Sequence, residues 1–283
     1  MKISPILPQH LADVGQFLHL NLNQQFSPQQ WISSLTHPWA EHVPNHGMQL
    51  HDGDSLVGVF CAIYSDQQID GRLEHFCNPH SWCVLETHRK HGVGLVLQII
   101  KQTGYHFTMF TPNGKVAQVF LGLKFKRLDD RRYRCFNLPG PAVLRSGSVV
   151  ESRRDHIAAY LRGQDLHEFK AHCDIPWLNF VVFGRGGELC WVVFKPTRWK
   201  RLPAARIMHV SDAALFARFN GLLRTHLLRK YRLVTMDVEA RYVQAAPQLA
   251  WLEQRTPPKL FLSKTLDPAK VRDLYSELMS LDV

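Results

Sequence analysis

The sequence predicts an α/β protein with two domains, each a mixed, twisted β-sheet flanked by helices. Short apolar runs typical of strands alternate with longer segments in which apolar residues recur at helical spacing. The chain has 283 residues, enough for two domains of ordinary size. A stretch rich in Pro, Gly and Ser at residues 139–150 is the predicted linker, so the domains span residues 1–138 and 151–283.

The composition is that of a globular protein. Hydrophobic residues make up 45% and charged residues 20%, which excludes long disordered segments. No apolar run approaches the roughly 18 residues that cross a bilayer, so we expect no export and no membrane span. The six cysteines form no C-x-x-C pair, which favours buried free thiols in a reducing cytoplasm. The net charge of +10 favours anionic partners such as CoA, an acidic substrate, nucleic acid or anionic lipid, without choosing among them.

Two helices and several strands are expected before residue 82. Apolar spacing predicts a helix over Gln9 to Leu22, and Ser27-Pro28 is typical of the capped start of a second helix. Strand patterns follow at residues 48–51, 55–64 and 72–76, with turns at 52–54 and 67–71.

The stretch from Trp82 to Gly104 predicts a strand, a glycine-bearing turn and a helix. Gly92 and Gly94 leave room for a ligand to approach the backbone, and the free amides of a helix start attract negative charge. The pattern fits a phosphate-binding turn. Taken alone, it fits an ordinary helix start in any α/β protein equally well.

A further strand pattern at residues 105–111 leads into a second motif, and the combined order resembles the GNAT family of acyl-CoA N-acyltransferases. In that family R/Q-x-x-G-x-G/A follows a strand, and N-x-x-A-x-x-x-Y-x-x-x-G-F comes later. Arg89, Gly92 and Gly94 match the first motif. In the second motif Asn113 and Phe125 match, Ala117 lies one position from the expected alanine, and Phe120 and Lys124 replace the tyrosine and the glycine. The resemblance covers residues 1–138.

The resemblance implies acetyl-CoA, or another acyl-CoA, as co-substrate and no metal. It implies that amides from His91 to Leu95 hold the pyrophosphate and that Arg89 adds positive charge. The strand at Val84 would pair with the pantetheine arm and donate its amide to the oxyanion. The implied cofactor-binding residues are Val84, Arg89, Lys90, His91, Gly92, Val93, Gly94, Leu95 and Asn113.

Acyl transfer to an amine also needs a base, and the strands before the turn offer three candidates. Counting back by twos from Val84 puts Trp82, His80 and Asn78 on one face, so His80 is the first candidate. Glu74 and Glu86 are the second and third, and each of the three also fits a structural or surface polar residue. Because Phe120 cannot donate a proton, the leaving thiolate would take one from Tyr105, Tyr133 or a water, or the activity is weak.

A zinc site is an alternative for the segment His75 to Cys83, which holds two histidines and two cysteines. The paired C-x-x-C spacing is absent, and strand alternation would split these side chains between two faces. We therefore expect strand residues here and no metal.

The second half repeats the order of three strands, a helix and a strand. Residues 126–136 fit a closing hairpin of the first domain. Helices are predicted at 154–172 and 213–230, and strands at 177–183, 188–194, 206–210 and 233–238. The helix start at Ser211-Asp212 lacks glycine, and an Asp cap would occupy the amides and repel a pyrophosphate. The second domain is thus expected to be a degenerate GNAT-like copy. The basic, aromatic segment Lys195–Arg201 fits a solvated hairpin turn better than a substrate-facing surface.

The leading hypothesis is a cytoplasmic N-acetyltransferase, or another N-acyltransferase, acting on an amine of a small molecule or a cell-envelope precursor. The positive charge of the chain allows this acceptor to be anionic. A rival hypothesis is a catalytically weak or inactive CoA-binding sensor or scaffold, suggested by Phe120 and Lys124. A nucleic-acid-binding module is disfavoured, because the basic residues are spread along the chain with no recognisable nucleic-acid motif.

Overall fold

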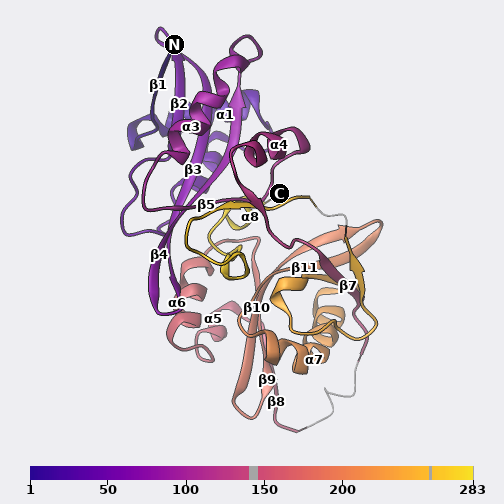
Figure 1. The fold of residues 1–283 in the computed structure, drawn as a ribbon. Coiled ribbons are helices and arrows are strands. Elements are labelled where there is room, and N and C mark those ends of the chain that lie inside the picture. Colours follow the sequence, from indigo (N-terminus) through magenta and orange to yellow (C-terminus); the bar gives the residue numbers. More distant parts are fainter. Residues whose placement is uncertain (140–145, 255–256, 283) are drawn as a thin grey trace. The chain divides into compact units, whose positions relative to one another are not determined.

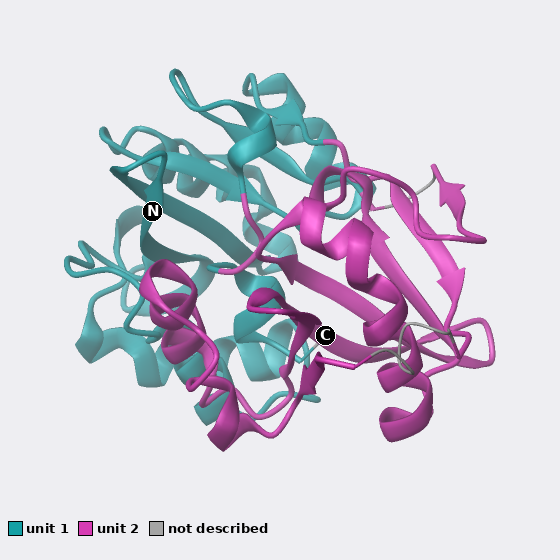
Figure 2. Cartoon of the chain, turned by 90° about the horizontal axis from the view of Figure 1, so that it is seen from below, with its two compact units in different colours: residues 1–128, 258–271, 275–283 teal, residues 129–257, 272–274 magenta. Residues whose placement is uncertain are grey.

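The computed structural model describes residues 1–139, 146–254 and 257–282. The chain divides into two compact units (Figure 2). The first comprises Met1–Leu128, Pro258–Val271 and Tyr275–Val283, and the second Asp129–Pro257 and Arg272–Leu274. Each unit contains one seven-stranded mixed sheet with helices beside it, so the predicted α/β class is confirmed (Figure 1).

The sheet of the first unit has the strand order β1-β2-β3-β4-β5-β14-β6. Its strands are β1 (Lys2–Pro5), β2 (Gly47–Asp52), β3 (Ser55–Ile69), β4 (Arg72–Val84), β5 (His106–Met109), β6 (Lys126–Arg127) and β14 (Leu260–Leu262). Its helices are α1 (Leu11–Asn21), α2 (Pro28–Leu35), α3 (Gly92–Ile100), α4 (Gly114–Gly122) and α8 (Glu277–Ser280), with 3₁₀ segments η1 (Pro8–His10), η2 (Glu86–His91) and η5 (Pro268–Lys270). Only β4 and β5 run parallel among the neighbouring strands described here.

Two apolar cores cover the two faces of this sheet. On one face Phe60, Ala62 and Tyr64 of β3 pack with buried residues of α3 and α4. On the other face Val59 and Cys61 pack with buried residues of α1 and α2. Because successive strand residues point to opposite faces, the continuous apolar run of β3 serves both cores.

The predicted early helices are confirmed. Helix α2 starts at a capping box, in which Ser27 Oγ accepts from the Gln30 amide at 3.2 Å and Gln30 Oε1 accepts from the Ser27 amide at 2.8 Å. The predicted turn at 67–71 is shorter than expected, because β3 continues to Ile69 and only Asp70 and Gly71 take up positive φ.

The sheet of the second unit has the order β13-β7-β12-β11-β10-β9-β8. Its strands are β7 (Arg132–Phe136), β8 (Ser148–Glu151), β9 (Asn179–Arg185), β10 (Glu188–Trp199), β11 (Leu202–Val210), β12 (Thr235–Glu239) and β13 (Trp251–Glu253). Its helices are α5 (Arg154–Ile157), α6 (Gly163–His172) and α7 (Ala213–Tyr231), with the 3₁₀ segment η4 (Ala240–Tyr242). Helix α7 packs its apolar side chains against one face of the sheet.

The single helix predicted over residues 154–172 is wrong, because Gly163 has φ +54° and the chain forms α5 and α6 instead. The predicted cap of α7 is confirmed at Asp212, whose Oδ1 accepts from the amides of Ala214 and Leu215, both at 2.8 Å.

The closing hairpin predicted at residues 126–136 is also wrong. Strand β6 pairs with β14, whereas β7 pairs with β12 and β13 of the second sheet. The units therefore differ from the predicted boundaries 1–138 and 151–283, since each half of the chain gives a strand to the sheet of the other half. Residues 140–145 of the predicted linker lie outside the described residues, and β8 begins at Ser148.

The end of α4 explains one departure from the family motif. The Phe125 amide donates to Phe120 O and the Lys124 amide to Leu121 O, both at 3.1 Å, and the Phe120 and Phe125 rings meet edge to face at 4.9 Å. This is a Schellman ending, which requires a left-handed residue at the position after the cap. Lys124 occupies it with φ +69°, a conformation that costs a residue with a side chain about 1 kcal/mol.

We expect Lys124→Gly to raise the free energy of unfolding by roughly 1 kcal/mol, because glycine adopts this backbone conformation without steric cost. Urea denaturation followed by circular dichroism measures the change. The control Gln118→Gly, at an exposed position inside α4, should lower stability by roughly 1 kcal/mol. A loss of stability in Lys124→Gly would contradict this account.

Candidate active site

Strands β4 and β5 separate soon after they meet. Their backbone pairing is limited to Phe76 with His106 and Cys77 with Phe107. The side chain of Asn78 makes the last link, with Nδ2 donating to the carbonyl oxygen and to Oγ1 of Thr108, each at 3.1 Å. Beyond Asn78 and Thr108 the described residues of the two strands form no further backbone pairs.

Pro79 gives a physical reason for the separation. Its partner Ala62 on β3 donates its amide hydrogen to His46 O, away from β4, so Ala62 and Pro79 form a non-hydrogen-bonded pair. The nitrogen of Pro79 therefore faces β5, where it has no hydrogen to donate. Sequence reasoning did not use Pro79, although proline inside a strand pattern signals an edge or a bulge.

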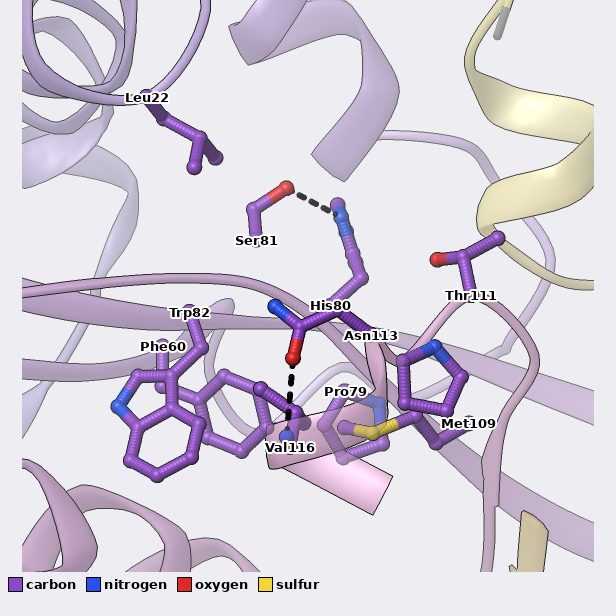
Figure 3. Close-up of a pocket in the computed structure, with 11 residues that line it drawn as sticks. Leu22, Phe60, Pro79, His80, Ser81, Trp82, Met109, Thr111, Asn113 and Val116 are labelled. Carbon is purple, nitrogen blue, oxygen red and sulfur yellow. Dashed lines mark hydrogen bonds between the residues drawn. The ribbon is translucent and has the colours of Figure 1, made fainter. Parts of the chain in front are cut away.

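A cavity of about 180 Å³ lies between the diverging strands. It is lined by residues 79–82 of β4, by Met109 and Thr111 at the end of β5, by Asn113 and Val116 at the start of α4, and by Phe60 and Leu22 (Figure 3). All of these residues belong to the first unit.

A β-bulge at Ser81 shapes this cavity. Trp82 pairs with Phe60 and His80 pairs with Cys61, so Ser81 is an extra residue, and its φ is +53°. The bulge puts Trp82 on the face that carries α3 and α4, and His80 on the face that carries α1 and α2. The prediction that Val84, Trp82 and His80 share one face is therefore wrong, because the count by twos assumed a regular strand. Figure 3 shows His80 pointing away from Trp82 and Phe60.

His80 is a neutral, buried imidazole. Its side chain is 5% exposed, its Nδ1 lies 2.8 Å from Ser81 Oγ, and its Nε2 has no hydrogen-bond partner in the described part of the chain. Burial, with a smaller contribution from His37, lowers the pKa of His80 to about 3. When Nδ1–H donates to Ser81, Nε2 carries a lone pair that can accept a proton.

The other three predicted catalytic residues do not line this cavity. Glu74 Oε2 accepts from His106 Nε2 at 2.8 Å and borders a separate cavity together with Tyr105. Glu86 is exposed and pairs with Arg89 at 2.9 Å. Tyr133 lies on β7 and packs against the core of the second unit.

The predicted cofactor-binding turn forms a 3₁₀ helix, η2, that runs directly into α3. The Gly92 amide donates to Arg89 O within this helix. His88, Arg89, Lys90 and His91 form its last turn and place basic side chains before the first amides of α3, those of Val93, Gly94 and Leu95. Basic residues at a helix start favour an anion there.

The two glycines also serve packing. A Cβ on Gly92 would lie 3.3 Å from the Trp82 ring and 3.4 Å from Val84 Cγ2, and one on Gly94 would lie 2.8 Å from Ile3 Cδ1. Both glycines thus allow α3 to approach the sheet closely. Val84 lies at the end of β4, where it packs against this helix start.

Asn113 caps α4, since its Oδ1 accepts from the Val116 amide at 3.0 Å (Figure 3). Its Nδ2 has no partner among residues 1–139, 146–254 and 257–282 and lines the cavity. Trp82 Nε1 is buried and likewise lacks a partner in those ranges, but it lies against the start of α3, since a Cβ on Gly92 would be 3.4 Å from it. The cavity therefore offers the Asn113 Nδ2 group, and His80 Nε2 beside it has no internal hydrogen-bond partner in the described ranges.

Phe120 is fully buried and packs against Phe60, Trp82 and Phe125. No group of three His, Cys, Asp or Glu side chains that could hold a metal occurs in the described ranges. Cys77 and Cys83, weighed above as zinc ligands, belong to the cores on opposite faces.

Comparison with solved structures gives the fold. A GCN5-related N-acetyltransferase from Anabaena variabilis matches with TM-score 0.60 and 9% identity, over 92% of this chain and 72% of that one. A conserved protein of unknown function from Enterococcus faecalis, described as a probable N-acyltransferase, matches with TM-score 0.61 and 10% identity over the same shares. Eis1 from Mycobacterium abscessus matches with TM-score 0.53 and 11% identity, over 92% and 73%. No protein-family model matches the sequence, and no curated protein matches it significantly.

The chain has the GNAT fold. Within this GNAT fold the parallel pair β4 and β5 forms the centre of the first sheet, with the cavity at the point where the pair opens. No helix in the described ranges is long and apolar enough to cross a bilayer.

The buried His80 should make the protein sensitive to acid. Between pH 6.5 and about 3 the unfolded chain binds a proton at His80 that the folded chain does not, so the free energy of unfolding falls as the pH is lowered through this range. At pH 5 this contribution is about 2 kcal/mol. Urea denaturation at pH 7 and pH 5 measures how far the free energy of unfolding falls between the two. In His80→Gln this fall should be smaller than in the wild type by about that amount. The exposed control His42→Gln should keep the wild-type drop, and an equal drop in His80→Gln would contradict the neutral, buried histidine.

Proposed function

We propose that the chain is an acyl-CoA-dependent N-acyltransferase that transfers an acetyl group, or another acyl group, to an amine of a small molecule or cell-envelope precursor. The observation that carries this proposal is the position of His80, a neutral base with an unpartnered nitrogen, in the cavity where β4 and β5 separate. The GNAT fold and the basic start of α3 support it, because the anionic part of acyl-CoA needs positive charge and free amides.

The reaction requires that the attacking amine lose a proton as its nitrogen bonds to the thioester carbonyl carbon. His80 Nε2 accepts this proton in our proposal. Breaking of the carbon–sulfur bond then releases CoA as a thiolate. We assign the Asn113 amide, which lines the cavity, as a side-chain donor to the polar atoms of the thioester.

The leaving thiolate takes its proton from water in this proposal. Phe120 carries no acidic hydrogen and is sealed in the core. Tyr105 borders the separate cavity and Tyr133 lies on β7, so neither lines the site of reaction.

The alternative is a CoA-binding sensor or scaffold with little or no turnover, which Phe120 favours because its buried ring cannot donate the proton that the usual tyrosine would supply. Incubation with labelled acetyl-CoA and a panel of amines separates the two. Label appears on an amine only if the chain is an enzyme.

We expect calorimetry to show one equivalent of CoA per chain. The Asp212 carboxylate already occupies the first amides of α7 and would repel a pyrophosphate there, whereas the corresponding start of α3 has basic neighbours. Gly94→Asp should weaken binding by at least tenfold, because it adds negative charge at the α3 start.

The matched control is Gly94→Ala, which adds only the methyl group that Ile3 Cδ1 can move to accommodate, and it should bind CoA nearly as wild type does. Binding of two equivalents of CoA per chain would refute the proposal that the second unit does not bind CoA. Unchanged affinity in Gly94→Asp would refute the site at α3.

For an amine that is turned over, His80→Gln should slow acyl transfer roughly a hundredfold with CoA affinity unchanged. Because the pKa of His80 is about 3, the wild-type kcat/KM should show no ionisation of this residue between pH 5 and pH 8, and any rise there belongs to the acceptor amine. Pre-steady-state rates across this range provide the measurement. A wild-type rate in His80→Gln would leave His80 as a structural residue.

A further inference from the structure

The second unit carries a cluster of exposed apolar side chains around the tip of the β10–β11 hairpin. The Trp251 ring lies 5.4 Å from the Trp199 ring and 5.7 Å from the Phe136 ring. Leu202 is the register partner of Trp199, Leu138 comes two residues after Phe136, and Leu249 comes two residues before Trp251. Apart from Trp199, which is half-buried, each of these side chains is more than a third exposed, and Leu249 reaches 72%.

Exposed apolar residues scattered singly need no explanation, but a connected group such as Phe136, Trp251, Trp199 and Leu202 marks an interaction surface. Leu249 adds a second indication, because it keeps its large side chain in solvent at φ +58°, a conformation that is costly for a branched residue. The group draws on β7, β10, β11 and β13 of one sheet (Figure 1).

Three basic residues surround the hairpin tip. Arg198, Lys200 and Arg201 are exposed, and none of them forms an ion pair within the described ranges. Lys200 Nζ lies 4.9 Å and Arg134 Cζ 5.0 Å from the centre of the Trp199 ring. These three basic residues and the apolar group of Phe136, Leu138, Trp199, Leu202, Leu249 and Trp251 form what we call the aromatic–basic patch.

We propose that the aromatic–basic patch docks on the surface of a lipid bilayer that contains anionic phospholipids. Leucine and tryptophan side chains enter the boundary between headgroups and acyl chains, while Arg198, Lys200 and Arg201 contact the lipid phosphates. Charge complementarity selects the anionic surface, since the three cations have no carboxylate partner of their own within the described ranges.

Two other occupants fit the patch less well. Single-stranded nucleic acid needs open aromatic faces for its bases, but Arg134 and Lys200 lie over the Trp199 ring. A second copy of the chain, related by a two-fold axis, would bring two sets of unpaired basic residues together. A bilayer uses both the apolar and the cationic side chains at once.

The test is flotation of the full chain with vesicles of phosphatidylcholine alone and of phosphatidylcholine mixed with phosphatidylglycerol. We expect binding only to the mixed vesicles, and weaker binding at high salt. The triple variant Arg198→Gln, Lys200→Gln, Arg201→Gln should bind about a hundredfold more weakly, and the double variant Leu138→Ser, Leu249→Ser about tenfold more weakly.

The matched control for charge is Lys101→Gln, Lys126→Gln, Lys264→Gln, three exposed lysines of the first unit, which should lose no more than a few-fold in affinity. Circular dichroism verifies that each variant is folded. Calorimetric CoA binding, which the patch does not serve, should be unchanged in all of them.

Absence of binding to the mixed vesicles, or equal loss in the control and the patch variants, would overturn the proposal. So would sedimentation showing a dimer that the Leu138→Ser, Leu249→Ser variant dissociates, because the patch would then be an interface between copies. Single-stranded RNA binding that requires the patch, without vesicle binding, would assign it to nucleic acid instead.

Discussion

The candidate site depends on one missing hydrogen-bond donor. In a parallel pair each strand needs regularly spaced donors toward its neighbour, and Pro79 presents a nitrogen without hydrogen to β5. The two strands therefore part directly after Asn78 and leave the cavity between them. The bulge at Ser81 turns His80 and Trp82 to opposite faces, so that these two residues line the cavity from different sides.

Features encoded by neighbouring residues were predictable from the sequence. The capping box at Ser27, the Asp212 cap, the long helix α7 and the turn of Asp52 to Asp54 all rest on side chains within a few positions of each other. The positions of β7 and β14 were not predictable, because their partners lie far along the chain and no local pattern distinguishes one sheet from the other. The same limit applies to His80. The sequence singled it out as a candidate, but the sheet face that its side chain occupies depends on the bulge at Ser81, which strand alternation cannot reveal.

The departures from the family motif change chemistry while they preserve structure. Phe120 keeps an aromatic ring at the centre of a cluster with Phe60, Trp82 and Phe125, but removes the hydroxyl group. Lys124 keeps the left-handed helix ending that lets Phe125 pack on Phe120, at a cost in backbone energy. The packing requirements of α4 are therefore met without a hydroxyl group at residue 120.

The two sheets have the same strand order and the same pattern of parallel and antiparallel pairs, so each position in one sheet can be compared with its counterpart in the other. In each sheet three antiparallel pairings lead to a parallel pair across a helix, β4 with β5 across α3 and β11 with β12 across α7. The second sheet even repeats the bulge, since Val193 pairs with His209 and Phe194 with Ile207, leaving Met208 as the extra residue.

The surroundings of this second bulge are filled by the protein itself. The His209 ring lies 4.7 Å from the Trp191 ring, and its Nε2 lies 3.7 Å from the buried Glu168 carboxylate. At the start of α7 the Asp212 side chain accepts hydrogen bonds from the first amides. The start of α3, by contrast, follows a turn of basic residues. The second unit thus differs from the first at two corresponding points, the surroundings of the bulge and the start of the helix between the parallel strands.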